Sequence, residues 1–331
     1  MLILGIETSC DETAASIVKD GRQVLSSVVS SSLRYHKKFG GVIPEIATRH
    51  HVENIDKVVD RSLKDAHIDI KDVDLVAVTQ GPGLVGALLC GISFAKALSY
   101  SRGIPLLGVD HLAGHIYSAM MEEDAGFPFI GLTISGGHTR LSLFRDHDEH
   151  EIIGDTLDDA VGEAYDKVAK ILGLEYPGGP IIDRLAKKGN PKAIKFTCRA
   201  VKDTFNFSFS GIKTAVLYYV RDTGSGIRVP GKKVRIEDIA ASFQESVLQV
   251  IVKNSIKALE EYKIKKFVIG GGVSANSRFR ELIKQEFFRK GFKAYFPPLK
   301  LCSDNGAMIA GLAYHLYRKG KRSPLDITAN I

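Results

Sequence analysis

The strongest constraint on the fold of this chain is a short segment that occurs twice. Residues 5–20 align with residues 131–146 without a gap, and their apolar positions also coincide. The identical pairs are Gly5 and Gly131, Ser9 and Ser135, Thr13 and Thr139, Ser16 and Ser142, and Asp20 and Asp146. Each copy is an apolar run, a turn of small and polar residues and a second apolar run, which is the pattern of a β-hairpin. We therefore predict a chain of two similar halves, the alternative being two unrelated hairpins with similar turns.

A second feature follows in the same order in each half. An apolar run at residues 75–79 precedes the turn QGPG at 80–83, and a run at 267–269 precedes the turn GGG at 270–272. Each turn leads into a helical pattern, so each half contains the elements of a βαβ unit. Two such lobes resemble the α/β architecture of actin, sugar kinases and Hsp70 (the ASKHA fold). This two-lobed fold has duplicated β-hairpin and βαβ units, and its glycine loops face a nucleotide-binding cleft.

The length of 331 residues also favours two lobes, because a single core rarely serves more than about 250–300 residues. We expect an N-terminal actin-like lobe at residues 1–125 and a C-terminal actin-like lobe at residues 126–331. Within residues 155–235, the stretch 190–233 mixes charge, aromatic residues and glycine with weak periodicity. We expect this region to form an inserted helical or lid segment within the second lobe.

The amino-acid composition is that of a globular protein, and it narrows the classes of protein to which this chain can belong. Apolar residues make up 44% and charged residues 25% of the chain, and no window approaches the about 18 uninterrupted apolar residues of a membrane span. The N-terminal apolar run lacks a basic leader, so we expect a cytoplasmic protein with no membrane contact.

The four cysteines show no CxxC spacing, which favours neither a disulfide framework nor a zinc knuckle. The net charge of +7 favours an anionic partner such as RNA, although many proteins with a modest basic excess bind no polyanion.

A pair of histidines in the segment HLAGH, His111 and His115, suggests a metal site. If this segment opens a helix, the i, i+4 spacing places both imidazoles on one face, which suits a divalent ion. The alternative is a pair of solvated helix histidines. Leu112 stands where HExxH peptidases carry glutamate, so proteolysis is disfavoured. The best distant candidate for a third ligand is Asp304, whose competing role is the N-cap of the small-residue helix that follows it.

Polar residues in the second half suit a nucleotide. The glycines of residues 270–276 (GGGVSAN) allow close approach of the backbone, and Asn276 offers an amide for a base or ribose hydroxyl. Carboxylates crowd together at Asp158, Asp159, Glu163 and Asp166. Such crowding on a helix is unfavourable unless the groups are solvated, bind a metal or accept hydrogen bonds from sugar hydroxyls. The turn at residues 176–180 precedes Asp183 and is otherwise a plain connector.

Taken together, these stretches resemble the TsaD family, the bacterial branch of a group that includes the catalytic subunit of the KEOPS complex. The resemblance spans nearly the whole chain, and its blocks are GIETSCDET (5–13), GGVIPEIATRHHVENI (40–55), TQGPGLVGAL (79–88), HLAGH (111–115), SGGHT (135–139), GEAYDKVAKILGLEYPGGPIID (162–183), FSFSGIKT (207–214), IAASFQE (239–245), GGVSAN (271–276) and CSDNGAMIA (302–310). Such a set in this order is highly specific.

The resemblance implies a role for each matching residue. It implies one divalent metal ion per subunit, iron(II) or alternatively zinc(II), with the ligands His111, His115 and Asp304. It implies contacts to the adenylate of the substrate from Thr133, Ile134, Ser135, Gly136, Gly137, Asp166, Gly179, Asp183 and Asn276. Asp11 and Glu12 match acidic positions close to the reaction centre, where we expect a catalytic role in accepting the amine proton.

The reaction that the resemblance implies is acyl transfer. Threonylcarbamoyl-AMP would donate its threonylcarbamoyl group to N6 of adenosine 37, immediately 3′ of the anticodon, in tRNAs reading codons that begin with A (t6A formation). A protein-bound metal ion would act as Lewis acid and anchor. The implied partners are tRNA, a TsaB-like paralogue and a TsaE-like small ATPase. The alternative is an ATP-dependent phosphotransferase or chaperone-like ATPase of the same fold. Basic candidates for contact with tRNA phosphates are Arg34, Lys37, Lys38, residues 232–235 and residues 318–322.

Overall fold

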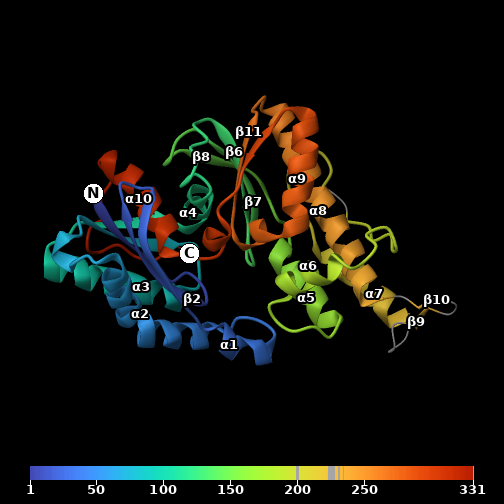
Figure 1. Ribbon diagram of the computed structural model, residues 1–331, viewed down its shortest axis with the longest axis horizontal. Coiled ribbons are helices and arrows are strands. Elements are labelled where there is room, and N and C mark those ends of the chain that lie inside the picture. The colour runs from blue at the N-terminus through green and yellow to red at the C-terminus, as the bar shows by residue number, and fades with distance from the viewer. Residues whose placement is uncertain (199–200, 223–227, 230–231, 234, 331) are drawn as a thin grey trace. The chain divides into compact units, whose positions relative to one another are not determined.

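A computed structural model describes residues 1–198, 201–222, 228–229, 232–233 and 235–330, without the side chains of residues 222–234. The chain divides into two compact units (Figure 1). Unit 1 comprises residues 1–124 and 297–331, and unit 2 comprises residues 125–296. Each unit has its own hydrophobic core.

Unit 1 is built on a mixed five-stranded sheet. Its strands lie in the order β3 (Gln23–Ser31), β2 (Glu12–Lys19), β1 (Leu2–Glu7), β4 (Leu75–Gly81) and β5 (Leu106–Asp110). β2 runs antiparallel to both β1 and β3, whereas β4 runs parallel to β1 and β5. Strands β1 and β2 are buried almost throughout, so both faces of the sheet must be covered.

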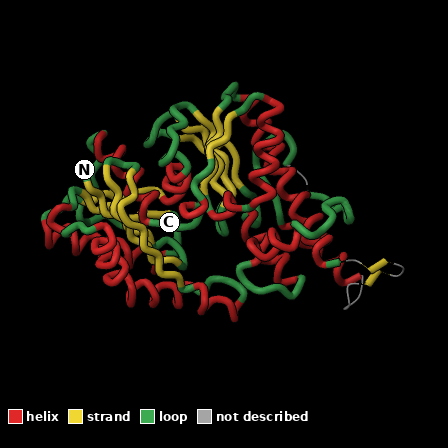
Figure 2. The backbone as a smooth tube through the Cα atoms, viewed as in Figure 1, coloured by secondary structure: helices red, strands yellow, loops and turns green. Residues whose placement is uncertain are grey.

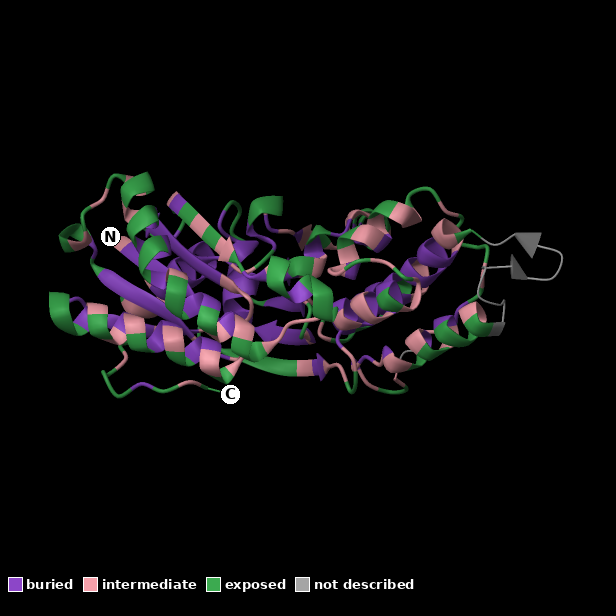
Figure 3. Ribbon diagram, turned by 90° about the horizontal axis from the view of Figure 1, so that it is seen from below, coloured by how far each residue is buried: buried purple, intermediate pink, exposed green. Residues whose placement is uncertain are grey.

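Helices on both sides cover this sheet (Figure 1). They are α2 (Pro44–Ala66) with α3 (Val85–Arg102), which pack against each other, and α4 (His111–Ser118) with α10 (Gly306–Arg318), which form the other pair. Shorter helical segments of unit 1 are α1 (Leu33–His36), η1 (Lys37–Phe39), η2 (Ile70–Asp72) and η4 (Leu299–Leu301). Figure 3 shows buried strands beneath helices whose outer faces are exposed, which is the pattern expected for amphipathic covering helices.

Unit 2 repeats the sheet of unit 1 (Figure 2). Its strands lie in the order β8 (His150–Asp155), β7 (Thr139–Phe144), β6 (Phe129–Ile134), β11 (Lys266–Gly270) and β12 (Lys293–Tyr295). β7 runs antiparallel to both β8 and β6, whereas β11 runs parallel to both β6 and β12, as in unit 1. Even the register agrees, because Gly5 lies opposite Ser16 and Gly131 lies opposite Ser142. The predicted duplication is therefore confirmed.

The helices of unit 2 supply most of its core. They are α5 (Val161–Ile171), α6 (Gly178–Ala186), α7 (Ser210–Asp222), α8 (Ile236–Glu261) and α9 (Ser277–Lys290), with η3 (Gly272–Ala275) and the short strands β9 (Arg228–Val229) and β10 (Lys232–Lys233). The expected inserted segment at residues 155–235 contains α5, α6 and α7. Tyr165, Phe207 and Phe209 of this segment are fully buried in the core, so it is part of the body of unit 2. Some of its residues lie outside the described part of the chain.

The structure differs from the expected lobes at the C-terminal end. We expected residues 126–331 to form one lobe, but residues 297–331 belong to unit 1. The reason is the packing of α10 on β1 and β2. A Cβ added to Gly306 would lie 2.5 Å from the Gly5 carbonyl oxygen and 2.7 Å from the Ser16 nitrogen, so only glycine allows this approach.

Three helices begin at capping residues that bear on the site. Asp110 caps α4, Asn276 caps α9 and Asn305 caps α10, each through a side-chain oxygen that accepts a backbone N–H. These caps fix where each helix starts and hence which way its first side chains point. Among the residues that the structure describes, no helix combines the length and apolar character needed to cross a membrane.

Candidate metal centre and adenylate site

The two histidines of HLAGH lie at the start of α4. The Asp110 carboxylate accepts a hydrogen bond from the Ala113 nitrogen at 2.7 Å, so the helix begins at His111, directly after β5. The i, i+4 spacing then places His111 and His115 on one face, with ring centroids 4.6 Å apart. Both side chains are buried, at 5% and 0% exposure of the residue. The alternative of solvated histidines is therefore wrong.

Asp304 comes from the other end of unit 1's sequence and meets these histidines. Its carboxylate oxygen lies 3.0 Å from His115 Nε2 and 3.8 Å from His111 Nε2. One ligand atom from each of the three residues lies within 4.8 Å of the others. The competing role of Asp304 as N-cap is wrong, because Asn305 caps α10 by accepting from the Met308 nitrogen at 2.9 Å.

The three side chains have the chemistry of a site for a divalent ion. His115 is fully buried, and its Nε2, which faces the Asp304 carboxylate at 3.0 Å, makes no aligned hydrogen bond within the described part of the chain. A buried polar atom without a partner is unfavourable, and a bound ion would supply the missing partner. Two imidazoles and one carboxylate suit iron or zinc. The residues present therefore fit a metal ion, whereas their geometry does not choose between these metals.

Sequence analysis missed a further carboxylate at this centre, that of Glu7. Glu7 ends β1 and is fully buried. Its carboxylate lies 2.9 Å from His111 Nδ1 and also accepts hydrogen bonds from the Thr79 hydroxyl and the Ser9 nitrogen. Burial raises the pKa of Glu7, but His111 and these hydrogen bonds outweigh burial and hold it below its ordinary value. The signal in the sequence was a glutamate within an apolar strand, where a charged residue is rarely placed without a partner.

Asp11 lies in the turn between β1 and β2, and Glu12 is the first residue of β2; both are beside this cluster. Burial, followed by the nearby carboxylate of Asp304, raises the pKa of Asp11. The same causes, with Asp11 and Glu7 as further neighbours, raise the pKa of Glu12 well above its ordinary value. Like charges that share a buried region disfavour ionisation, which makes both groups stronger bases.

Two buried histidines hold the backbone of this acidic turn. His51 Nε2 lies 3.0 Å from the Cys10 carbonyl, which can only accept, so Nε2 carries the proton and Nδ1 accepts from the Thr13 hydroxyl at 2.8 Å. His36 Nδ1 accepts from the Ile43 nitrogen at 3.2 Å. His36 Nε2 therefore donates to Ser32 Oγ at 2.8 Å, and Ser32 Oγ donates to the Asp11 carbonyl at 2.8 Å.

The expected adenylate residues lie in unit 2, on segments that contact one another. Thr133 and Ile134 are buried at the end of β6, so they support the turn at Ser135–Gly137 that follows. The Gly162 nitrogen donates to the Ser135 carbonyl at 3.2 Å, which joins the start of α5 to this turn. A Cβ built at Gly136, Gly137 or Gly179 would meet no described atom within 4 Å, so these glycines border open space.

The remaining expected residues make hydrogen bonds that shape the same region. Asp166 accepts from the Gly178 nitrogen at 2.7 Å and so joins α5 to the start of α6. Asp183 accepts from the Ser277 hydroxyl at 2.9 Å. Asn276 caps α9 through its oxygen and donates to Gln244 Oε1 at 2.8 Å. Much of the hydrogen-bonding capacity of Asn276 is thus used within the protein.

The other carboxylates of the acidic stretch have partners inside the protein. Asp158 accepts hydrogen bonds from the backbone and hydroxyl groups of residues 208–210, and these bonds hold its pKa below its ordinary value although burial opposes them. Asp159 pairs with Lys167 at 2.6 Å and Lys213 at 3.2 Å, and Glu163 pairs with Lys167 at 2.8 Å. These contacts explain the crowding of acidic residues without a ligand.

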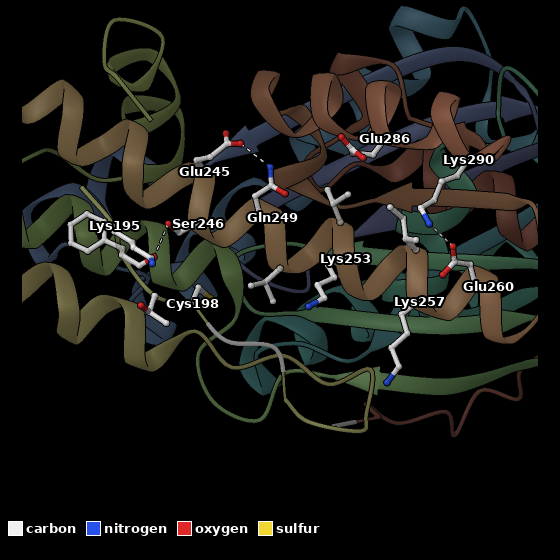
Figure 4. Close-up of a pocket in the computed structure, with 15 residues that line it drawn as sticks. Lys195, Cys198, Glu245, Ser246, Gln249, Lys253, Lys257, Glu260, Glu286 and Lys290 are labelled. Atoms are coloured by element: carbon white, nitrogen blue, oxygen red, sulfur yellow. Dashed lines mark hydrogen bonds and ion pairs between the residues drawn. The ribbon is translucent and has the colours of Figure 1, made fainter. Parts of the chain in front are cut away.

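A hollow of about 1100 Å³ lies elsewhere on unit 2, against α8 and α9 (Figure 4). Each glutamate that lines it has a basic partner: Glu245 pairs with Arg278, Glu260 with Lys290 and Glu286 with Arg289. Lys195, Lys253 and Lys257 also line it and make no ion pair with any described residue. Figure 4 shows Lys253 and Lys257 projecting from the same side of α8. We name this hollow, with the residues of α8, α9 and 195–198 that line it, the lysine groove.

Comparison with known proteins decides the family. The family model TsaD, described as tRNA N6-adenosine threonylcarbamoyltransferase, matches residues 23–311. The chain belongs to this family. A protein of that name from Dictyoglomus turgidum (strain DSM 6724 / Z-1310) is 50% identical over 331 residues, which cover 100% of this chain and 98% of the relative. A protein of the same name from Bacillus subtilis (strain 168) is 49% identical over 328 residues, covering 99% and 94%. The predicted family and the class of enzyme, a transferase, are confirmed.

Two solved structures resemble the chain in fold alone. The (R)-2-hydroxyglutaryl-CoA dehydratase component A of Acidaminococcus fermentans has a TM-score of 0.58 and 16% identity, covering 97% of this chain and 100% of that one. Full-length HypF has a TM-score of 0.63 and 16% identity, covering 97% of this chain and 47% of its own. Together with the duplicated sheets, this likeness confirms the predicted α/β fold of the actin, sugar-kinase and Hsp70 class.

Proposed function

We propose that this protein transfers the threonylcarbamoyl group of threonylcarbamoyl-AMP to N6 of adenosine 37 in tRNAs reading codons that begin with A. The observation that carries the proposal is similarity along the full chain to proteins named tRNA N6-adenosine threonylcarbamoyltransferase. The geometry of unit 1 adds support, because it groups two imidazoles with carboxylates of the kind that acyl transfer from a mixed anhydride can use.

His111, His115 and Asp304 would hold one divalent ion in unit 1. Their closeness supports this assignment, as does the buried Nε2 of His115, which faces Asp304 but makes no aligned hydrogen bond within the described residues. Iron(II) suits the ligand set, as does zinc(II), and three protein ligands leave open positions for substrate. When bound, the ion supplies a Lewis acid that polarises the donor carbonyl and anchors the donor.

Residues of unit 2 would bind the adenylate of the donor. The backbone N–H groups of Ser135, Gly136 and Gly137 suit a phosphate, because successive amides in a glycine turn form a pocket for anions. The open space beside Gly136, Gly137 and Gly179 leaves room for a ligand. Thr133 and Ile134 would support the turn from β6, while Asp166, Asp183 and the remaining amide hydrogen of Asn276 would face ribose and adenine.

The transfer itself needs a base and close positioning. N6 of the adenosine attacks the carbamoyl carbon, a C–N bond forms, the C–O bond to the phosphate breaks and AMP leaves. The N6 lone pair is delocalised into the ring, so holding the two reactants together contributes much of the rate. The proton released from N6 would pass to Asp11 or Glu12. Burial, the largest cause of their raised pKa values, favours this role, since a carboxylate with a raised pKa accepts a proton more readily.

The proposed partners are those implied by the reaction and the family. They are tRNA, a TsaB-like paralogue and a TsaE-like small ATPase, in the cytoplasm. Arg34, Lys37, Lys38 and the basic residues of 318–322 are exposed and remain candidates for phosphate contact. Residues 232–235 lie partly outside the described residues. The lysine groove is a further candidate, because its glutamates are already paired whereas Lys195, Lys253 and Lys257 make no ion pair with any described residue.

Reconstitution tests the proposal directly. The purified chain would be incubated with its partners, threonylcarbamoyl-AMP and unmodified tRNA, and the modified nucleoside would be measured by mass spectrometry. We expect t6A from the wild type and none from the double variant His111→Ala, His115→Ala, whose circular dichroism should match that of the wild type. Equal t6A from both proteins would contradict the proposed metal site, and ATP hydrolysis without t6A would favour a phosphotransferase or chaperone-like ATPase.

A further inference from the structure

Glu7 is a buried carboxylate whose position needs a reason. It is the last residue of β1, and its side chain is fully inaccessible to solvent. Burying a carboxylate costs several kcal/mol unless hydrogen bonds or an opposite charge offset the lost hydration. A neutral glutamine would cost less to bury, but it has only one acceptor oxygen, so a carboxylate is what serves the donors on both sides of this position.

The contacts of Glu7 define which atoms carry hydrogens. Oε1 accepts from the Ser9 backbone nitrogen, which can only donate. Oε2 accepts from the Thr79 hydroxyl and lies 2.9 Å from His111 Nδ1. An ionised carboxylate only accepts, so the hydrogen between Oε2 and Nδ1 belongs to the imidazole, and Ser9 Oγ, 3.2 Å from the same nitrogen, can accept it as well. His111 is thereby held as the Nδ1–H tautomer.

This tautomer directs a lone pair toward the other two ligands. A neutral imidazole has one N–H and one accepting nitrogen, so fixing the hydrogen on Nδ1 leaves Nε2 free to bind a metal. Nε2 of His111 is the nitrogen that lies 3.8 Å from the Asp304 carboxylate, which in turn is 3.0 Å from His115 Nε2. The opposite tautomer would place a hydrogen where an ion must sit.

The two histidines differ in this respect. His115 Nδ1 is buried and has no hydrogen-bond partner within the described residues. His111 alone therefore has a carboxylate behind it that fixes its ring. Carboxylate partners of metal-binding histidines typically change metal affinity by about 10–100-fold.

We propose that Glu7 is a positioning residue that fixes the metal-binding tautomer of His111. The inference rests on the proposed role of His111, His115 and Asp304 as metal ligands. It adds a residue that acts through His111 and touches neither substrate nor metal.

The variant Glu7→Gln tests the inference in the full-length chain. The Ser9 nitrogen requires an oxygen at the Oε1 position, so the glutamine NH₂ takes the place of Oε2 and donates to His111 Nδ1. The tautomer of His111 should then reverse. We expect ¹⁵N spectra of the metal-free proteins, recorded above the His111 pKa, which Glu7 and Asp304 raise to about 9 although burial opposes them, to show Nδ1–H in the wild type and Nε2–H in the variant. Zinc or cobalt binding, measured by competition with a chelating dye, should weaken by about 10–100-fold.

Thr79→Val is the matched control. It removes a hydrogen bond to the same oxygen of Glu7 in a residue of nearly equal shape, but leaves the acceptor of His111 in place. We expect its metal affinity to stay within about 3-fold of the wild type, since the tautomer is retained. If Glu7 only stabilised the fold, the two variants would lose metal affinity in proportion to their loss of stability.

Several results would overturn the inference. An Nε2–H tautomer in the metal-free wild type would do so even if Glu7→Gln failed to fold, as would unchanged metal affinity in a folded Glu7→Gln. Failure of the proposed ligand set would look different, because His111→Ala and Asp304→Ala would then leave metal affinity unchanged as well.

Discussion

Asp304 and Asn305 are neighbours in sequence with separate tasks. Asp304 turns its carboxylate to His115 and His111, whereas Asn305 caps α10. We predict that Asp304→Asn weakens metal binding by at least about 10-fold while changing the free energy of unfolding by less than about 0.5 kcal/mol in the metal-free protein. Asn305→Ala should do the reverse, costing about 1 kcal/mol of stability through the lost cap while metal affinity is retained.

Urea unfolding of the metal-free proteins and metal titration separate these effects. The pair of variants serves as its own control, because the substitutions lie one residue apart at the same helix start. A loss of about 1 kcal/mol in Asp304→Asn together with full metal affinity would assign the capping task to Asp304 and contradict the prediction.

The residue-scale features differ in how well the sequence predicts them. The i, i+4 spacing placed His111 and His115 on one face, Asp304 was the best distant candidate for a third ligand, and the resemblance favoured its ligand role over its capping role. Whether Asp304 was a cap could not be decided from the sequence, since Asp and Asn both cap well and only the direction of each side chain separates them. Glu7 was missed because its contacts to Thr79 and His111 join segments far apart in the chain.

At the scale of elements, the turn between β1 and β2 depends on buried histidines from α1 and α2. Burial lowers the pKa of His36 despite nearby Asp11, and burial also lowers the pKa of His51. Below about pH 6.5 the unfolded chain therefore binds more protons than the folded one. We predict that stability is complete above pH 6.5 and falls as the pH drops toward the folded-state pKa, by at most about 1.4 kcal/mol per pH unit for each histidine.

His36→Gln tests the contribution of the first histidine. Protonating Nδ1 of His36 would set it against the Ile43 N–H that it now accepts from, so this residue should carry part of the loss. We expect a smaller decline in the free energy of unfolding between pH 7.5 and pH 5 in the variant, measured by urea unfolding. His67→Gln is the control, because His67 is an exposed helix-end residue. A decline as steep in His36→Gln as in the wild type would show that His36 does not contribute.

Elements were predicted best where a pattern repeated. The aligned hairpins and glycine turns led to both sheets, and the register of Gly5 with Ser16 and of Gly131 with Ser142 follows the same alignment. The segment at residues 155–235 was harder, because its helices depend on tertiary contacts. Asp158, for example, holds the start of α7 from a position about fifty residues earlier, which no local pattern reveals.

At the scale of the whole molecule, the return of residues 297–331 to unit 1 was not predictable from local patterns. The small residues of α10 allow close packing on many sheets, and its position on β1 depends on tertiary fits such as that of Gly306 against Gly5. This return has a functional consequence. It brings Asp304 into the unit that holds His111 and His115, so the candidate metal site is complete within unit 1.

The net charge of +7 favours an anionic partner, and the lysines that make no ion pair indicate where that partner would bind. In the lysine groove, Lys253 and Lys257 are one helical turn apart and project on the same side, so they suit neighbouring phosphates (Figure 4). We predict that Lys253→Glu with Lys257→Glu weakens tRNA binding. The slope of log affinity against log salt should become shallower by about 1.4–1.8, because each lost phosphate contact contributes about 0.7–0.9.

The control must change the net charge equally without touching the groove. Lys57→Glu with Lys64→Glu does this on the exposed face of α2. Filter binding of tRNA at several salt concentrations should show a reduced slope in the groove variant and the wild-type slope in the control. Equal changes in both variants would mean that the charge of the whole molecule, screened over about 10 Å at 0.1 M salt, drives association. Direct contact predicts a local effect instead, because counterions are released only from the phosphates that a lysine contacts.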